Sequence, residues 1–329
     1  MKKFVPLFLS LIASLIVAQN VYRETVTSTS LFIYLFSIVS CILFFTNIPK
    51  KLSLNTSALR SKSELVIILF LIVLQLSLLK YFSSFPFHYM QDEFVLAYTS
   101  YFLPLQNNIN WFSDFPNKSE WFIQFPIIFF VLQKPFLMFL GPSVESIDIS
   151  TWPYDILIIV YLYLLAKEYF KNRYFSYVVP VVYIFLAPSL YLSSLGLFHV
   201  SSVFFFLASF YYFLLTIRRQ ERKYAVLCGI FVSLSYLTYT SSYIALPLLF
   251  LFVLIEAVTK QSLKVLRLFV PSAVIIPIVM LPFLTYAVTK NNLFTQRISQ
   301  VSFLSSLTNQ TTGKENFSTK VSTPTCYKH

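Results

Sequence analysis

Charged residues are scarce in this sequence. Only 12% of the 329 residues are Asp, Glu, Lys or Arg, whereas 57% are hydrophobic. A water-soluble domain carries about 25% charged residues, so the composition excludes an ordinary soluble enzyme and indicates an integral membrane protein. Acids are the rarer sign, with 13 Asp and Glu against 25 Lys and Arg, and the net charge is +12.

Cysteine and glycine are also rare, with three and four copies. Cys41, Cys228 and Cys326 lie far apart in the sequence, so they do not indicate a disulfide framework or a metal motif. The few glycines do not form the GxxxG spacing that brings membrane helices into close contact. The fold is therefore expected to depend on ordinary side-chain packing.

The basic residues form five short clusters between apolar runs. This distribution is typical of the positive-inside rule for membrane proteins, and it argues against a nucleic-acid partner. We therefore predict that all five clusters, and the N-terminus, are cytoplasmic in a protein of the plasma membrane. The clusters fall at 2–3, 50–62, 167–173, 218–223 and 260–267.

Long apolar runs dominate the first 290 or so residues. A helix needs about 20 apolar residues to cross a bilayer, and on this basis we predict an all-α polytopic membrane protein with about nine transmembrane helices. The first run follows Lys2 and Lys3 as in a signal peptide, but a second run follows so closely that an uncleaved span is favoured. The predicted spans are 4–18, 31–48, 65–82, 151–166, 174–192, 197–217, 224–239, 241–258 and 266–288.

A further run, Trp121 to Leu140, is apolar enough to span but is predicted not to cross. Crossing would place the later basic clusters outside, and Pro126 and Pro135 interrupt helices. We predict a juxtamembrane or re-entrant helix at the outer surface. The chain then divides into three N-terminal spans (1–82), an extracytoplasmic loop with juxtamembrane helices (83–150), a six-span core (151–288) and a partly disordered polar tail (289–329).

Two adjacent carboxylates, Asp92 and Glu93, follow the third predicted span and are placed outside by the charge pattern. A charge at the mouth of a membrane domain is costly unless it is solvated or used, and partial desolvation tunes a carboxylate as a general base. Successive helical residues point about 100° apart, so one acid can act chemically while the other is structural or binds a hydroxyl or metal. The alternative is a solvated turn or helix start, which Asp and Glu favour.

Several stretches resemble, in order, motifs of one known family. Gln91-Asp92-Glu93 looks like its Asp-Glu motif in the first outer loop. Residues 125–128 (FPII) and 136–141 (FLMFLG) resemble its His-Pro-Pro-Leu helix ending in Leu-Phe-Gly, and 164–170 (LLAKEYF) resembles its Leu-Ala-Arg-Glu-Leu-Phe span end. The segments 191–215 and 229–247 resemble the paired spans that follow.

These motifs cover roughly Phe82 to Phe303 and resemble the GT-C class of integral-membrane glycosyltransferases. The nearest group is family 39, with the protein O-mannosyltransferases and lipid A aminoarabinose transferases, in which the helix matching 121–140 is juxtamembrane. The sequence departs from the family at Phe125 and Ile127, which replace a His and a Pro, and it lacks an Arg before Thr151. Relatives also continue further, so the resemblance implies a C-terminally truncated chain.

The resemblance implies transfer of a sugar from a polyprenyl-phosphate donor to a lipid, glycan or protein acceptor outside the membrane, with inversion. It implies Asp92 as general base beside Glu93, and a cation or metal near the donor phosphate. A divalent ion held by Glu93, His88 and His199 is one hypothesis, and no cofactor is certain. The predicted substrate-binding residues are Lys118, Lys134, Arg297, His88 and Tyr89.

Two other functions stay open. A transporter or lipid flippase usually buries polar groups near the middle of the membrane, whereas the inner thirds of the predicted spans lack Asp, Glu, Lys and Arg. A non-catalytic fragment that serves as a membrane scaffold is the third possibility, favoured if the donor site is incomplete.

Overall fold

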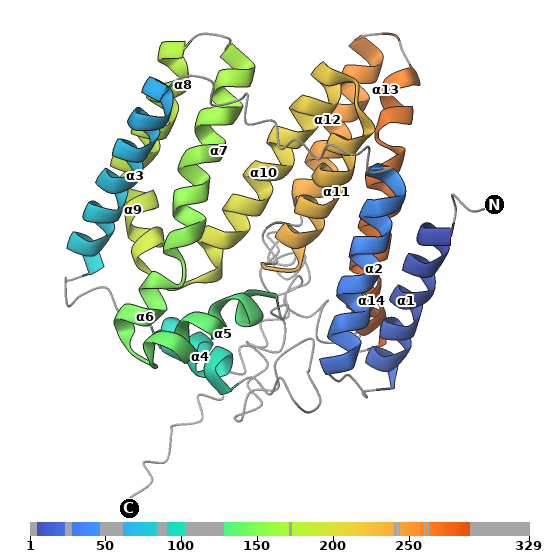
Figure 1. Ribbon diagram of the computed structural model, residues 1–329, viewed down its shortest axis with the longest axis horizontal. Helices are drawn as coiled ribbons and strands as arrows, with labels where there is room; N and C mark the ends of the chain where they lie inside the picture. The colour runs from blue at the N-terminus through green and yellow to red at the C-terminus, as the bar shows by residue number, and fades with distance from the viewer. Residues whose placement is uncertain are drawn as a thin grey trace, which may run out of the picture. The chain divides into compact units, whose positions relative to one another are not determined.

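Helices account for the regular structure of the described residues. A computed structural model (Figure 1) describes residues 5–23, 28–46, 62–83, 91–102, 128–170, 173–239, 242, 244–259, 261 and 263–289. The helices are α1 (Val5–Tyr22), α2 (Ser28–Thr46), α3 (Lys62–Ser83), α4 (Gln91–Phe102), α5 (Ile128–Leu140), α6 (Val144–Ile149), α7 (Trp152–Phe170), α8 (Arg173–Phe185), α9 (Ala187–Ser194), α10 (Phe198–Arg219), α11 (Arg222–Tyr236), α12 (Ala245–Thr259), α13 (Leu263–Leu268) and α14 (Val270–Thr289). The predicted all-α class is confirmed for this part of the chain.

Four helical stretches are long and apolar enough to cross a membrane. They are α1, α3, α10 and Val144–Phe170, which runs through α6 and α7, and the pair α8–α9, bent by 62°, would make a fifth. Such helices are those of an integral membrane protein. The predicted count of nine is not shown: the described apolar stretches of α2, α12 and α14 are shorter, each between 10 and 17 residues.

The long helices pack in a chain of neighbours. α7 contacts α8 and α10, α10 contacts α11, α11 contacts α14, and α14 contacts α1, which pairs with α2. Figure 1 shows this order from α8 to α1. Apolar side chains fill the contacts, with Ile158 and Phe204 between α7 and α10, and Phe213 and Cys228 between α10 and α11.

Ion pairs show which helix ends meet. Lys167 near the end of α7 lies 2.8 Å, Nζ to Oε2, from Glu64 at the start of α3. Arg218 at the end of α10 lies 3.4 Å, Nη1 to Oε1, from Glu168 near the end of α7. Helices α7 and α10 therefore run in the same direction, opposite to α3. Two of the predicted basic clusters thus meet at one end of the bundle.

Helix α1 is fastened to its neighbours by serine hydroxyls. Ser10 Oγ donates to the carbonyl of Ser37 at 2.7 Å, and Ser37 Oγ donates back to the carbonyl of Ser10 at 2.7 Å. Ser14 Oγ donates to the carbonyl of Ile278 on α14, also at 2.7 Å. Helix α1 is therefore packed into the bundle, and retention of the first span stays a prediction.

The reciprocal pair gives a testable stability effect. Hydrogen bonds between membrane helices contribute about 0.6 kcal/mol on average, so Ser10→Ala and Ser37→Ala should each lower the free energy of unfolding by about that amount. Because each hydroxyl also contacts the other, the double variant should lose less than the sum. Ser77→Ala is the control, because exposed Ser77 bonds only within its own helix. Thermal unfolding in detergent measures the differences, and strict additivity would contradict the coupling.

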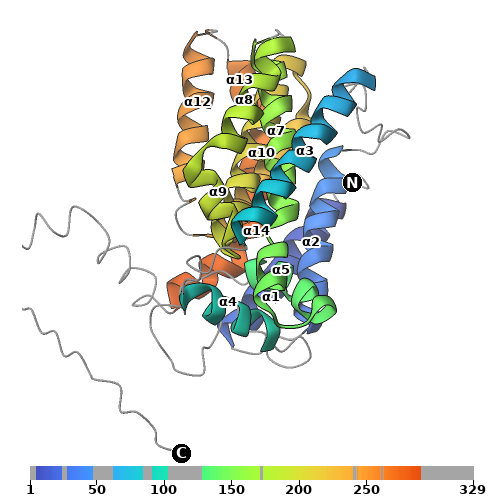
Figure 2. The same cartoon turned by 90° about the vertical axis from the view of Figure 1, so that its left-hand side faces the viewer.

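The short helices α4, α5 and α6 pack on one another. Both views place α4 and α5 at the same end of the bundle (Figures 1 and 2). Helix α5 has only 13 residues and contains Pro135, so it is too short to be a candidate span. Its predicted juxtamembrane position stays a prediction, and residues 121–127 lie outside the described part. The predicted domain boundaries likewise stay a prediction, and the tail from Lys290 onward is not described.

Candidate functional site

The two predicted catalytic acids lie in the first turn of α4. The Glu93 side chain is 2% exposed, and its Oε1 accepts a hydrogen bond from the backbone N–H of Gly196 at 3.2 Å. The side chain of Asp92 lies outside the described residues, as do the predicted binding residues Lys118, Arg297, His88 and Tyr89. Of the acidic pair, Glu93 is turned into the protein interior.

Gln133 on α5 is the centre of a hydrogen-bond network beside Glu93. Its Oε1 accepts from Ser100 Oγ of α4 at 2.6 Å. Its Nε2 donates to Ser150 Oγ and to the carbonyl of Gly196, both at 3.2 Å. One buried carboxamide therefore joins α4, Ser150 between α6 and α7, and the segment between α9 and α10.

Gly196 allows the segment between α9 and α10 to pack closely against α6. A Cβ at this position would lie 2.0 Å from Ile147 Cγ2 and 2.8 Å from the carbonyl oxygen of Ile147, so only glycine fits without a shift of the α6 backbone. Through its N–H and carbonyl, Gly196 bonds both Glu93 and Gln133. The backbone of the α9–α10 turn thereby fixes the start of α4.

A second buried carboxylate, Asp148 on α6, interacts electrostatically with Glu93. Asp148 is buried, and its backbone carbonyl accepts a hydrogen bond from Thr151 Oγ1 at 2.8 Å. Within the described ranges, no group of three His, Cys, Asp or Glu residues is placed to hold a metal ion. The hypothesis of an ion at Glu93, His88 and His199 stays untested, since His88 is outside those ranges.

Lys134 lies at the other end of α4. Its Nζ donates to the backbone carbonyl of Tyr101 at 2.7 Å, the side chain is 8% exposed, and burial lowers its pKa. Tyr101 is eight residues beyond Glu93, which is about 12 Å along a helix. The helix dipole stabilises a cation near the C-terminus of a helix. The contact of Lys134 with Tyr101 therefore holds α5 against the end of α4. Phosphate binding by Lys134 stays a prediction.

A second polar cluster, which the sequence analysis did not single out, surrounds Asp155 on α7. Asp155 is fully buried. Its Oδ1 accepts from Tyr183 OH at 2.5 Å and Ser193 Oγ at 2.7 Å, and its Oδ2 accepts from Gln75 Nε2 at 2.5 Å. The available signal was a lone Gln and a lone Asp in two apolar runs, because an ionisable residue inside a predicted span is a candidate functional residue.

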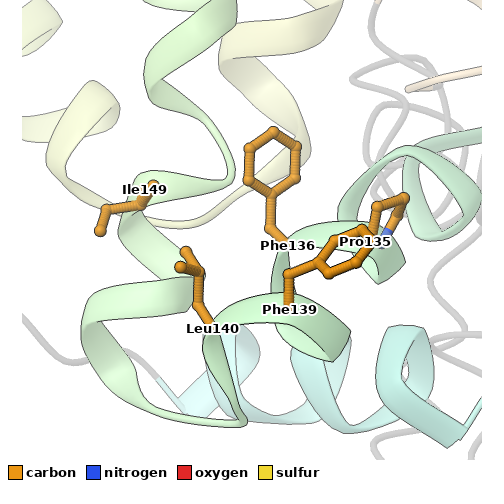
Figure 3. Close-up of a pocket in the computed structure, with 5 residues that line it drawn as sticks. All are labelled: Pro135, Phe136, Phe139, Leu140 and Ile149. Atoms are coloured by element: carbon orange, nitrogen blue, oxygen red, sulfur yellow. The ribbon is translucent and has the colours of Figure 1, made fainter.

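An apolar pocket of about 360 Å³ lies between α5 and α6. Figure 3 shows Phe136 and Leu140 of α5 on the side of Ile149 from α6, with Phe139 beside Pro135. Phe139 is 88% exposed, and no polar surface lines the pocket. The pocket and the exposed Phe139 therefore give α5 an apolar surface suited to lipid.

No protein-family model, curated protein or solved structure matches this chain. The structure shows a helical protein with four or five candidate membrane spans among the described residues. The likeness to GT-C glycosyltransferases rests on the sequence motifs alone.

The Gln133 network predicts a clear loss of stability. Gln133→Leu should lower the free energy of unfolding by about 1–3 kcal/mol, because the carbonyl of Gly196 loses a buried donor. Gln19→Leu on the exposed side of α1 should change it by less than about 0.5 kcal/mol. Thermal unfolding of both variants measures the contrast, and equal melting temperatures would contradict the role of Gln133.

Proposed function

We propose that this protein is a membrane glycosyltransferase that moves a sugar from a polyprenyl-phosphate donor to a lipid, glycan or protein acceptor. The reaction takes place on the extracytoplasmic face of the plasma membrane, with a cytoplasmic N-terminus. The acceptor oxygen attacks the anomeric carbon, Asp92 takes the acceptor's proton, and the polyprenyl phosphate leaves with the electrons of the broken bond. The configuration at the sugar carbon inverts.

The observation that carries the proposal is the fixed position of Glu93. Its buried carboxylate accepts from the Gly196 N–H, which supports a role in positioning the start of α4. Asp92 precedes it in the same helix, about 100° away around the helix axis. The helix start is thus immobilised by one acid while the other occupies a different face, the arrangement that a positioned general base requires.

The apolar pocket between α5 and α6 supports a lipid-linked donor. The pocket at Phe136 and Ile149 is wholly apolar, as an isoprenoid chain requires. In this proposal a divalent ion assists the residues that bind the donor phosphate and sugar, which are Lys118, Lys134, Arg297, His88 and Tyr89.

The test is transfer of label from a panel of polyprenyl-phosphate sugars by the purified protein in lipid vesicles, with a survey of acceptors. Release of free polyprenyl phosphate should match the sugar transferred, and the product should have the inverted anomeric configuration by NMR. Retention of configuration would overturn the proposed single displacement. Transfer from nucleotide sugars but not from lipid-linked ones would overturn the donor class.

A transporter or flippase is the second candidate, and the buried cluster at Asp155 favours it. Transporter sites are commonly built at broken helices, and α8 and α9 meet at a 62° bend next to Tyr183 and Ser193. Flux of lipid-linked sugars or small ions in vesicles separates the two functions. Flux without transfer would favour transport.

A further inference from the structure

The cluster at Asp155 joins four helices. Gln75 belongs to α3, Asp155 to α7, Tyr183 to α8 and Ser193 to α9. The three partners contact both carboxylate oxygens at 2.5 to 2.7 Å. Tyr183 OH and Ser193 Oγ also lie 3.4 Å apart. The cluster therefore gathers polar side chains of α3, α8 and α9 around one buried acid of α7, with two hydroxyl oxygens and one amide nitrogen in contact with the carboxylate.

The Asp155 carboxylate has no ion-pair partner within the part of the chain that the structure describes: none of the Lys or Arg ion pairs found there includes Asp155. An ion buried away from water costs several kcal/mol without a counter-charge. The start of α7 offsets part of this charge, but Ser193 lies in the last turn of α9, where the helix dipole is negative.

Gln75 adds an unused acceptor to the same cluster. Its Oε1 is buried without a hydrogen-bond partner, while its Nε2, on the same carbon atom, donates to Asp155. An unsatisfied buried carbonyl is costly. A cation bound by the carboxylate, and by this amide oxygen once the amide turns its oxygen toward the acid, would relieve both defects.

We infer that Asp155, Gln75, Tyr183 and Ser193 form a binding site for one sodium ion. All of the available ligand atoms are oxygens, which hard cations prefer. The single carboxylate matches one positive charge. A divalent ion would leave an excess charge, and the described residues contain no cluster of acids, His or Cys to compensate it.

The site also spans the break between α8 and α9. Tyr183 lies before the bend and Ser193 after it, so an ion bound to both would hold the bend in one geometry. Discontinuous helices are a common element of sodium sites in membrane proteins. The inference does not depend on glycosyl transfer, because it concerns a different set of residues.

The experiment is thermal unfolding of the full chain in detergent, with sodium chloride replacing choline chloride at constant ionic strength and pH. Sodium should raise the melting temperature saturably, and potassium should do so less. Binding of radioactive sodium should approach one ion per chain. Asp155→Asn, which keeps the size of the side chain, should abolish the sodium response, whereas Glu145→Gln, an exposed acid, should keep it.

A second variant guards against misfolding of Asp155→Asn. Gln75→Met removes the amide oxygen and should raise the sodium concentration needed for half the effect by about tenfold, as loss of a supporting polar group typically does at metal sites. A sodium response unchanged in both variants would overturn the site. Stabilisation by lowered pH instead of sodium would overturn it too, and would assign a proton to Asp155.

Discussion

Asp92→Asn is expected to lower the rate of sugar transfer by about 10²–10⁴-fold, the usual contribution of a general base. Asparagine has nearly the same size but cannot take the acceptor's proton. The melting temperature should stay close to that of the native protein, because Glu93, and not Asp92, is the acid that bonds the Gly196 N–H. The measurement is initial transfer rate at matched expression, together with thermal unfolding.

Glu93→Gln is the matched control for that result. The glutamine keeps an oxygen that can accept from Gly196, so we expect moderate losses in both stability and rate rather than a selective loss of rate. If Asp92→Asn keeps full activity, Asp92 is not the base. If Glu93→Gln alone removes activity without changing the melting temperature, the two roles are reversed.

The burial of Glu93 was not predicted from the sequence. Consecutive positions on a helix face about 100° apart, so local geometry predicts only that two adjacent acids differ in direction. Which of them turns inward depends on the Gly196 N–H, 103 positions further along the chain. No local pattern around Asp92 contains that information.

The predicted membrane spans were likewise only partly correct in where they placed the helices. Apolar runs predicted helices where α1, α3 and α10 lie, because hydrophobic length alone sets this requirement. The run at 174–192 was predicted as one helix, but the structure breaks it into α8 and α9 at Leu186. Pro188 lies at the start of α9, where its missing N–H is tolerated, so the proline was the available signal for the break.

The Asp155 cluster was missed because its ligands come from separate helices. Asp155 lies outside the inner third of its predicted span, so a rule based on depth in the membrane passed over it. Gln75 lies 80 positions earlier in the chain, and it bonds to Asp155 only because α3 packs on α7. A single Gln or Asp in an apolar run marks a candidate buried polar position. Its hydrogen-bond partner is known only from the tertiary packing.

Gly196→Ala is expected to lower the free energy of unfolding by about 3 kcal/mol, the upper range for overpacking a buried site. The added Cβ would lie 2.0 Å from Ile147 Cγ2 and 2.8 Å from the Ile147 carbonyl oxygen. The side chain can rotate, but the carbonyl belongs to α6 and moves only with the helix. Transfer activity should fall as well, because the displaced Gly196 N–H no longer holds Glu93.

Gly141→Ala is the matched control, since a Cβ there meets nothing within 4 Å and only the φ of +83° is unfavourable. That variant should lose about 1 kcal/mol. The double variant Gly196→Ala with Ile147→Ala should lose less stability than the sum of its two single losses, because Cγ2 is removed while the carbonyl contact stays. Thermal unfolding of the single variants and the double variant decides the point. If Gly196→Ala is no less stable than Gly141→Ala, the backbone at Gly196 has room, and the start of α4 is held by something other than this close approach.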